Sequence, residues 1–266
     1  MKEYLNIDNS GQTTFKVSKT SRVEYLINEN DYEEALREID KLLKDDENAD
    51  NLNLKGMILD KLSQYSAAVE CFDKSLQLEQ SDETMFNKAQ TLYNWAKITF
   101  FPENNYNDAL KLIDDALDVL PESFDASEFY FLRAEILEAL EDLVESHKSY
   151  LIAYKQFDKL KEFESQTEYL ESTPDTLINI VGCEFYNYSP ESGSTVSLVK
   201  DLENEHDPDA IAIQVEGNTV GYVANSDYTL IDEVKSASNI KNSLSEDQKA
   251  EILFVYFGEY VIAKLL

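Results

Sequence analysis

The chain has 266 residues, enough for two domains that each bury a core of their own. Its 53 acidic residues against 23 lysines and arginines give a formal net charge of -30, spread along the chain, which disfavours attraction to nucleic acid or to an anionic membrane. No run approaches ~18 consecutive apolar residues and the first residues lack the apolar core of a signal peptide, so we expect a cytoplasmic protein without membrane contact.

The first two thirds of the chain contain a repeat. Residues 1–16 are polar and carry no hydrophobic pattern, so we expect a flexible leader. After them, four segments align in register, and three aligned columns hold an aromatic or leucine, a small residue and a large apolar residue at helical spacing. The columns are Tyr32, Tyr65, Tyr106 and Leu143; Ala35, Ala68, Ala109 and Ser146; and Ile39, Phe72, Ile113 and Tyr150. Such spacing predicts helices that pack closely on one another.

A partner helix precedes the later segments, with Gly56, Ala89 and Ala134 at the helix crossing. Together the helices resemble a tetratricopeptide array over about residues 17–156. The step from the second to the third unit is longer than the usual repeat, and Trp95 is predicted as a core residue beside this insertion. A last amphipathic helix, DKLKEFESQTEYLES, is expected to cap the repeats and to complete a helical domain of residues 17–173.

The tetratricopeptide resemblance implies a concave groove that binds an extended peptide or protein segment. The implied lining is Glu24, Asn53, Met57, Asp60, Phe86, Gln90, Tyr93, Phe131, Glu135 and Glu138. The lysine and asparagine set that clamps chaperone carboxylates is not among these residues. An acidic and aromatic lining suits a basic or apolar segment, through charge complementarity and buried aromatic anchors. The alternative is that several of these side chains simply face solvent or pack inside.

From Thr176 onward the sequence changes to short runs rich in Val, Ile, Phe and Tyr, which predict strands. Six such runs and a short helix within residues 229–237 indicate a compact, largely closed barrel over residues 174–266. Gly258 and Glu259 are predicted to close a two-residue hairpin. The predicted fold is therefore two-domain: an all-α repeat superhelix followed by a small, mostly β, OB-like barrel.

The segments VGCEFYN, VSLVKDLENEHDPDAIAI and NTVGYV resemble the HIRAN domain over about residues 176–266. The best-known activity of that family is to hold the unpaired 3′ end of DNA, with aromatics stacked on bases, an aspartate on the 3′-hydroxyl and basic residues on phosphates. The face implied here is Phe185, Asn204, His206, Asp207 and Tyr222. The family's basic positions, however, hold Glu184, Tyr222 and Asn225. Residues 173–266 carry 5 basic against 16 acidic residues, a net charge of -11, which weakens phosphate binding.

The HDPDA corner also has a purely structural interpretation, in which Asp207 accepts backbone N–H bonds ahead of Pro208 as a turn residue. The acidic residues before it alternate like the first ligands of a calcium loop. His206 and Ala212 nevertheless replace the turn glycine and the bidentate glutamate of such a loop, so no metal is expected.

Few other residues offer chemistry. Cys71 and Cys183 are predicted to be small buried side chains, and His147 and His206 have no partner of metal-binding or catalytic spacing. The glycines form no phosphate-binding loop. We therefore expect no cofactor and no enzymatic activity.

Two functions remain open. One is an interaction scaffold whose groove binds a peptide while the barrel recognises a second partner. The other is a nucleic-acid-binding protein whose barrel holds single-stranded DNA 3′ ends while the repeats recruit repair or replication proteins. DNA binding requires Lys200 and Lys241 to flank the barrel face.

Overall fold

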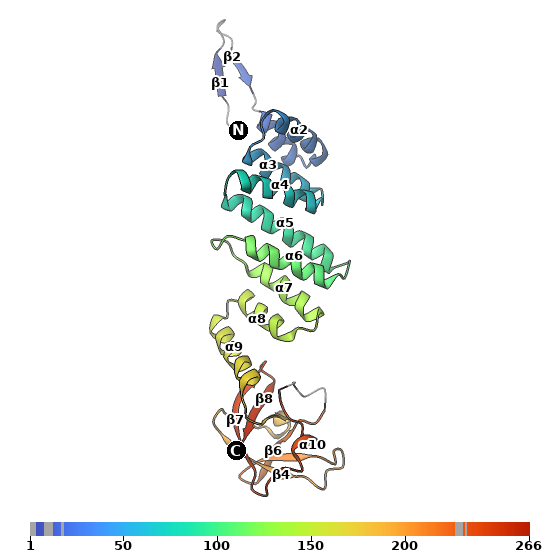
Figure 1. Ribbon diagram of the computed structural model, residues 1–266, viewed down its shortest axis with the longest axis vertical. Helices are drawn as coiled ribbons and strands as arrows, with labels where there is room; N and C mark the ends of the chain where they lie inside the picture. The colour runs from blue at the N-terminus through green and yellow to red at the C-terminus, as the bar shows by residue number, and fades with distance from the viewer. Residues whose placement is uncertain (1–3, 8–12, 17–18, 227–230, 232) are drawn as a thin grey trace. The chain divides into compact units, whose positions relative to one another are not determined.

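The computed structural model describes residues 4–7, 13–16, 19–226, 231 and 233–266 (Figure 1). The chain divides into two compact units, Met1–Gln156 and Phe157–Leu266. The expected fold class is confirmed: helical hairpins of tetratricopeptide type come first, and a closed antiparallel barrel follows.

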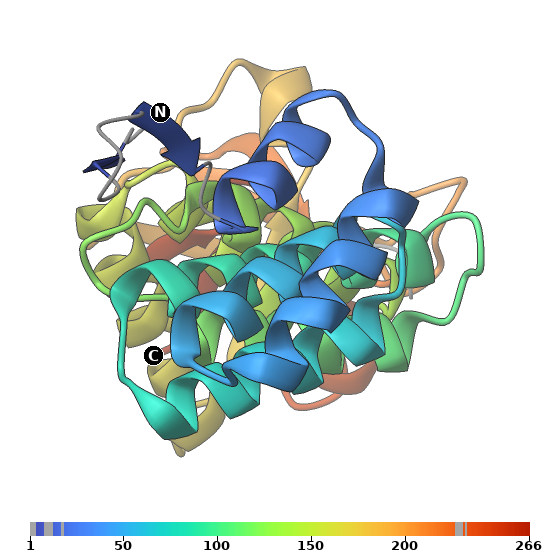
Figure 2. The same ribbon diagram turned by 90° about the horizontal axis from the view of Figure 1, so that it is seen from above.

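The first unit is built from antiparallel helical hairpins that stack in chain order (Figures 1 and 2). The pairs are α1 (Lys19–Asn28) with α2 (Tyr32–Asp45), α3 (Ala49–Lys61) with α4 (Tyr65–Leu78), α5 (Asp82–Phe100) with α6 (Tyr106–Val119), and α7 (Ser127–Ala139) with α8 (Leu143–Ala153). Within the leader, β1 (Tyr4–Ile7) and β2 (Thr13–Lys16) pair antiparallel. The rest of residues 1–16 lies outside the described residues, and its flexibility stays a prediction.

The small-residue columns of the sequence form the helix contacts. Ala35, Ala68 and Ala109 are completely buried, as are the large side chains that follow them in the first three hairpins. Gly56 of α3 marks a close crossing, because a Cβ built there would lie 2.6 Å from the ring of Phe72 on α4. Close helix approach at small residues is therefore what joins the two helices of a hairpin.

An ion pair recurs between successive hairpins. In each case a basic residue on the first helix of a hairpin reaches an aspartate on the second helix of the hairpin before it. The pairs are Lys55 Nζ with Asp40 Oδ1 at 2.8 Å, Lys88 Nζ with Asp73 Oδ1 at 2.6 Å, and Arg133 Nε with Asp114 Oδ1 at 2.8 Å. Because each pair joins equivalent positions, the three contacts align each hairpin with the previous one in the same register.

The extra residues within the third hairpin lengthen its first helix. The helix α5 has 19 residues, whereas α3 and α7 have 13 each. Trp95 lies in this longer helix, is half-buried, and stacks on Tyr65 of α4 with ring centroids 6.4 Å apart. It packs against the core of this hairpin, as the sequence predicted.

The second unit is a closed barrel of six strands in the order β3-β6-β5-β4-β7-β8. The strands are β3 (Leu177–Val181), β4 (Thr195–Lys200), β5 (Ile211–Val215), β6 (Asn218–Val223), β7 (Lys249–Tyr256) and β8 (Tyr260–Leu265). A short 3-10 helix, η1 (Cys183–Tyr186), follows β3, and α10 (Ala237–Ile240) precedes β7. The core is aliphatic, with Ile178, Ile211 and Ile213 completely buried.

The helix α9 (Phe157–Ser172) belongs to the barrel unit, which differs from the expected cap on the repeats. Its buried residues Phe163, Thr167 and Leu170 follow helical spacing and form one face. The ring of Phe163 stacks on Tyr256 of β7 at 4.9 Å, and the hydroxyls of Thr167 and Tyr256 share a 2.8 Å hydrogen bond. An amphipathic pattern requires a buried face but does not specify which partner covers it. The two compact units divide at residue 156, before α9.

Two local predictions in the barrel differ from the structure. The β7–β8 turn holds Phe257, Gly258 and Glu259, because Tyr256 pairs with Tyr260. The predicted two-residue turn is wrong because Phe257 leaves the ladder and packs its ring on Phe163 at 4.9 Å. The helix predicted within residues 229–237 is not formed over the described residues 233–236, and residues 229, 230 and 232 lie outside the described part of the chain. The helix α10 begins at Ala237, the last residue of the predicted helix, with Ser236 as N-cap.

Among the described residues, no helix combines the length and the apolar composition needed to cross a membrane. Cys71 and Cys183 are both buried free thiols, as predicted. Burial is the largest cause that raises the pKa of each thiol, so neither is activated for chemistry.

Candidate functional site

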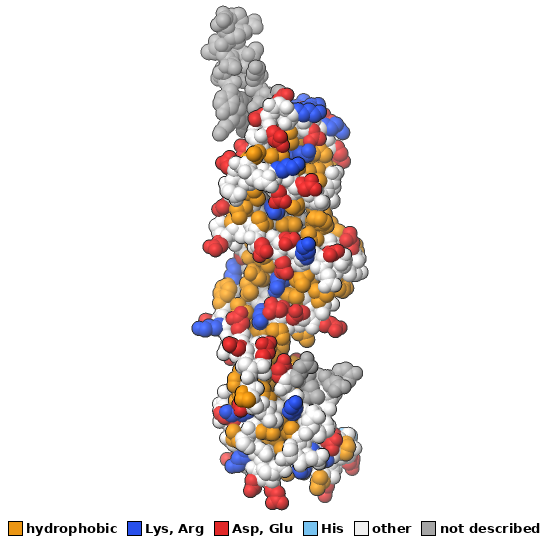
Figure 3. Space-filling model, in the orientation of Figure 1, with side chains coloured by type: hydrophobic (Ala, Val, Ile, Leu, Met, Phe, Trp, Pro, Cys, Tyr) orange, Lys and Arg blue, Asp and Glu red, His pale blue; other side chains and the backbone are white. Residues whose placement is uncertain are grey.

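The helices α1, α3 and α5, with the α4–α5 connection, line an open cavity of about 380 Å³ on the side predicted to bind peptide. Three of the expected groove residues, Glu24, Asn53 and Met57, line it together. Further lining comes from Thr20, Ala49, Asp50, Leu54, Glu79, Ser81, Glu83 and Thr84. The cavity therefore combines exposed carboxylates with apolar side chains. On the face seen in Figure 3, acidic side chains are spread over the repeat helices with apolar patches between them.

Other expected groove residues connect neighbouring hairpins. Asn87 Nδ2 donates to Asn53 Oδ1 at 3.1 Å, and Asn94 Nδ2 donates to Asp60 Oδ1 at 3.1 Å. Gln90 Nε2 in turn donates to Asn94 Oδ1 at 3.4 Å. Asn53 and Asp60 thus have hydrogen-bond partners across α3 and α5, whereas Gln90 bonds within α5. Sequence reasoning missed Asn87 and Asn94, although each follows its partner by the length of one repeat.

Several of the expected groove residues on α5 and α7 are aromatic. Phe86 of α5 stacks on Phe124 with ring centroids 4.4 Å apart, and Tyr93 packs on Phe129 of α7 at 5.1 Å. Both groove residues are half-buried. Burial is the largest cause that raises the pKa of Tyr93, and the negative charges of nearby glutamates add to it. These rings therefore belong partly to the packing between α5 and α7 and partly to the surface.

Phe131, Tyr150 and Tyr154 form an aromatic cluster on α7 and α8. Phe131 contacts both tyrosine rings. Tyr150 Oη donates to Glu138 Oε2 at 3.0 Å. Burial, followed by the Glu138 hydrogen bond, raises the pKa of Tyr150 to about 12. Glu138 and Phe131 were expected in the groove, whereas the two tyrosines were not, because they lie on the second helix of the hairpin.

On the barrel, a hydrogen-bonded network joins β6 to the β4–β5 loop. Tyr222 Oη and Asn204 Nδ2 both donate to Asp201 Oδ2 at 3.1 Å. Asn204 Oδ1 accepts the backbone N–H groups of His206 and Asp207 at 3.0 Å each. Burial, with hydrogen bonds to Tyr186 and Asp201, raises the pKa of Tyr222 to about 12. Asn204 thus shapes the loop as an Asx-type turn residue.

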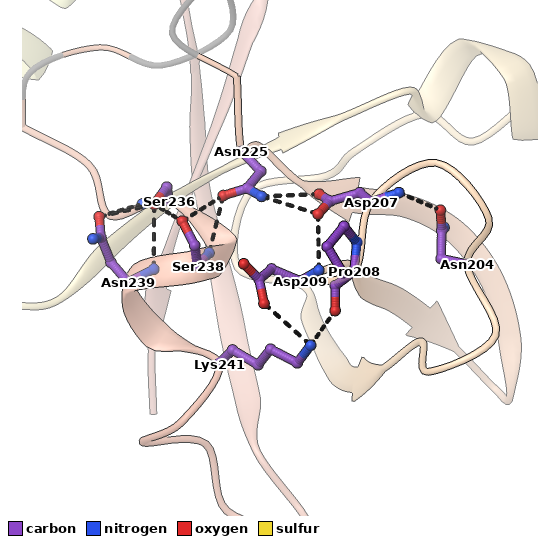
Figure 4. Close-up of polar contacts among 9 residues, drawn as sticks. All are labelled: Asn204, Asp207, Pro208, Asp209, Asn225, Ser236, Ser238, Asn239 and Lys241. Carbon is purple, nitrogen blue, oxygen red and sulfur yellow. Dashed lines mark hydrogen bonds and ion pairs between the residues drawn. The ribbon is translucent and has the colours of Figure 1, made fainter.

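Asp207 ties the same loop to α10 (Figure 4). Its Oδ1 accepts the backbone N–H of Asp209 at 2.8 Å, as the turn interpretation predicted. Asn225 Nδ2 donates to Asp207 Oδ1 at 3.2 Å and to its Oδ2 at 2.9 Å. Asn225 Oδ1 then accepts from Ser238, N–H at 3.0 Å and Oγ at 2.8 Å. Both carboxylate oxygens of Asp207 therefore already accept hydrogen bonds within the barrel.

Of the two lysines required for a DNA-binding face, Lys241 is engaged within the barrel. Lys241 Nζ donates to the carbonyl of Pro208 and pairs with Asp209 Oδ1 at 3.2 Å (Figure 4). Lys200 is exposed at the end of β4. Lys241 thus neutralises a carboxylate of that loop.

The structure joins Asn204, Asp207 and Tyr222 through the loop, and Phe185 lies on η1. Phe185 is 82% exposed. The ring that contacts Tyr222 belongs to its neighbour Tyr186, with centroids 6.3 Å apart. Sequence reasoning missed Tyr186 as a site residue, although it lies within the aromatic segment that carries the family resemblance.

Within the described part of the chain, no group of three or more histidines, cysteines and carboxylates is arranged to hold a metal ion. The alternating carboxylates before His206 therefore do not converge as a calcium loop would.

Comparisons with known proteins add a similarity in fold only. No protein-family model matches the chain, and no curated protein matches it. Among solved structures, a MamA double mutant is 19% identical, with 56% of this chain and 94% of that chain covered and a TM-score of 0.36. A second MamA structure is 15% identical, covering 53% of this chain and 97% of that chain, with a TM-score of 0.29. Similarities this low carry no argument about function.

Proposed function

We propose that this chain is a non-enzymatic interaction scaffold whose repeat groove binds a peptide segment that carries basic and apolar side chains. The observation that carries the proposal is the cavity between α1, α3 and α5. There, the exposed carboxylates of Glu24, Asp50 and Glu83 line the cavity together with the apolar side chains of Leu54 and Met57.

The chemistry of this cavity selects its ligand. A cationic side chain gains electrostatic attraction from the carboxylates, and an apolar neighbour buries surface against the leucine and methionine. The formal net charge of -30 adds long-range attraction for a basic segment. An acidic peptide would be repelled by the cavity carboxylates at short range and by the net charge at long range.

The test is fluorescence anisotropy with a short labelled peptide of alternating lysine and leucine, added to the full chain. We expect binding that weakens with salt, and none to the glutamate–leucine counterpart. The double variant Glu24→Gln with Glu83→Gln should weaken binding about fivefold, from roughly 0.5 kcal/mol for each exposed charge. The double variant Glu103→Gln with Glu122→Gln removes two exposed charges elsewhere on the repeats and should have little effect. Equal losses in both variants would reduce the interaction to non-specific charge attraction.

For the barrel, we propose recognition of a second protein partner through the HIRAN-like face around the exposed ring of Phe185. Three observations argue against DNA ends as the ligand: the occupied carboxylate of Asp207, the engagement of Lys241 with its own loop, and the net charge of -11 over residues 173–266. Anisotropy of a single-stranded oligonucleotide with a free 3′-hydroxyl tests this choice. We expect no binding; a salt-sensitive affinity that is lost on 3′ phosphorylation and in Asp207→Ala would replace the protein partner by a DNA end.

A further inference from the structure

In the aromatic cluster of Phe131, Tyr150 and Tyr154, one ring is roughly perpendicular to the other two. Phe131 stands edge-on to both tyrosines, with centroids 5.6 and 6.2 Å away and interplanar angles of 74° and 88°. The two tyrosine rings are nearly parallel, 18° apart, with centroids separated by 6.4 Å. Phe131 is 38% exposed and Tyr154 is 60% exposed. Aromatic surface of this extent on two adjoining helices is accessible to a ligand.

Two carboxylates belong to the same surface. Glu138 Oε2 accepts the Tyr150 hydroxyl at 3.0 Å. Glu135 lies one turn earlier on α7, and its charge also acts on Tyr150. The basic residues nearest in sequence pair with other carboxylates: Arg133 with Asp114, Lys148 with Glu145, and Lys155 with Asp125. Arg133 and Lys155 therefore pair with carboxylates other than Glu135 and Glu138.

We propose that the aromatic cluster, together with Glu135 and Glu138, binds the cationic head of a lysine or arginine side chain. This inference rests on the proposed function and specifies where the groove recognises one basic residue of its peptide. Ring faces attract a cation because their quadrupole is negative at the face. The neighbouring carboxylates add charge attraction that a purely apolar side chain could not use.

Other occupants suit the surface less well. A purely apolar segment would take solvent from Glu135 and Glu138 without giving them a partner, which costs free energy. A second copy of this chain carries a formal net charge of -30 and would be repelled at long range. A basic segment matches both the rings and the charges.

The experiment is a double-mutant cycle on the full chain. The labelled lysine–leucine peptide is prepared with each lysine in turn replaced by norleucine, which keeps the methylene stem and removes the ammonium. At one peptide position, norleucine should weaken binding to the wild-type chain about three- to tenfold, the range of one cation–π contact. Tyr154→Leu should weaken the parent peptide equally, and the two losses should not add. Glu138→Gln should weaken binding at the same position about threefold.

A matched control comes from Tyr25, which is as exposed as Tyr154, at 60%, but lies on α1. Tyr25→Leu should leave the affinity and the preference for lysine unchanged. The cation site would be overturned if the losses added at every peptide position, or if Tyr154→Leu bound the peptide as well as the wild-type chain. The groove proposal would survive either result if the wild-type chain still preferred the lysine peptide. No binding of any peptide to the wild-type chain would overturn both. Thermal unfolding of Tyr154→Leu confirms that the variant is folded.

Discussion

Single residues decide how closely the helices of a hairpin approach, and Gly56 is the clearest case. Its replacement by alanine would put a Cβ 2.6 Å from the ring of Phe72, which is completely buried. We expect Gly56→Ala to lower the free energy of unfolding of the repeats by about 1–3 kcal/mol, the usual cost of overpacking a core. Urea denaturation followed by circular dichroism measures the change.

The next hairpin supplies the control for this prediction. Its equivalent positions hold Ala89 and Ile113, both completely buried, so an alanine is tolerated where the facing side chain is smaller. Phe72→Ile alone should destabilise by leaving space, but combined with Gly56→Ala it should cost less than the sum of the two single changes. Additive costs would mean that the glycine is required for some reason other than contact with Phe72.

At the scale of elements, the bonds of Asn225 hold the β4–β5 loop to α10. Asn225→Asp is nearly isosteric, yet it would set two carboxylates at hydrogen-bond distance in place of the amide donor to Asp207. Near neutral pH we expect the barrel to lose about 1.5–3 kcal/mol, the value of a hydrogen bond to a charged group. The deficit should shrink as the pH falls, because the folded pair takes up a proton more readily than the unfolded chain does.

Urea denaturation near neutral pH and at about pH 4 tests this prediction, with exposed Asn242→Asp as a control for the added charge. A deficit in Asn225→Asp that is the same at both pH values would argue against carboxylate repulsion as its cause.

Some contacts between elements were predictable from the sequence and others were not. The columns of small and large residues predicted the hairpins, because helix contacts repeat with the chain. The repeated ion pairs were readable too, since Asp40, Asp73 and Asp114 each follow a large buried residue. In the last hairpin that position is Leu151, 7% exposed, so α8 offers no aspartate to a further repeat. Asn225 was not predictable as the partner of Asp207, because only folding brings these distant residues together.

At the scale of the whole molecule, the assignment of α9 determines where the chain can be divided. The hydrophobic spacing of Phe163, Thr167 and Leu170 predicted a buried face correctly. The buried face of α9 packs on the ring of Tyr256 and bonds to its hydroxyl. The sequence pattern of β7 indicates that Tyr256 lies in a strand, but it does not indicate that α9 is its partner. A division at residue 173 would therefore remove a helix that the barrel uses.

Phe163→Ala in the full chain tests this assignment. Because the ring is buried against Tyr256 and Phe257 in the barrel unit, its loss should lower the stability of the barrel by about 3–5 kcal/mol. Hydrogen exchange should show faster opening of amides in β7 and β8, with amides of α1–α6 unchanged. Fragments give an independent measure: residues 157–266 should unfold cooperatively, and residues 174–266 should be markedly less stable. Equal stability of the two fragments would mean that α9 contributes nothing to the barrel, and the functional boundary would return to residue 173.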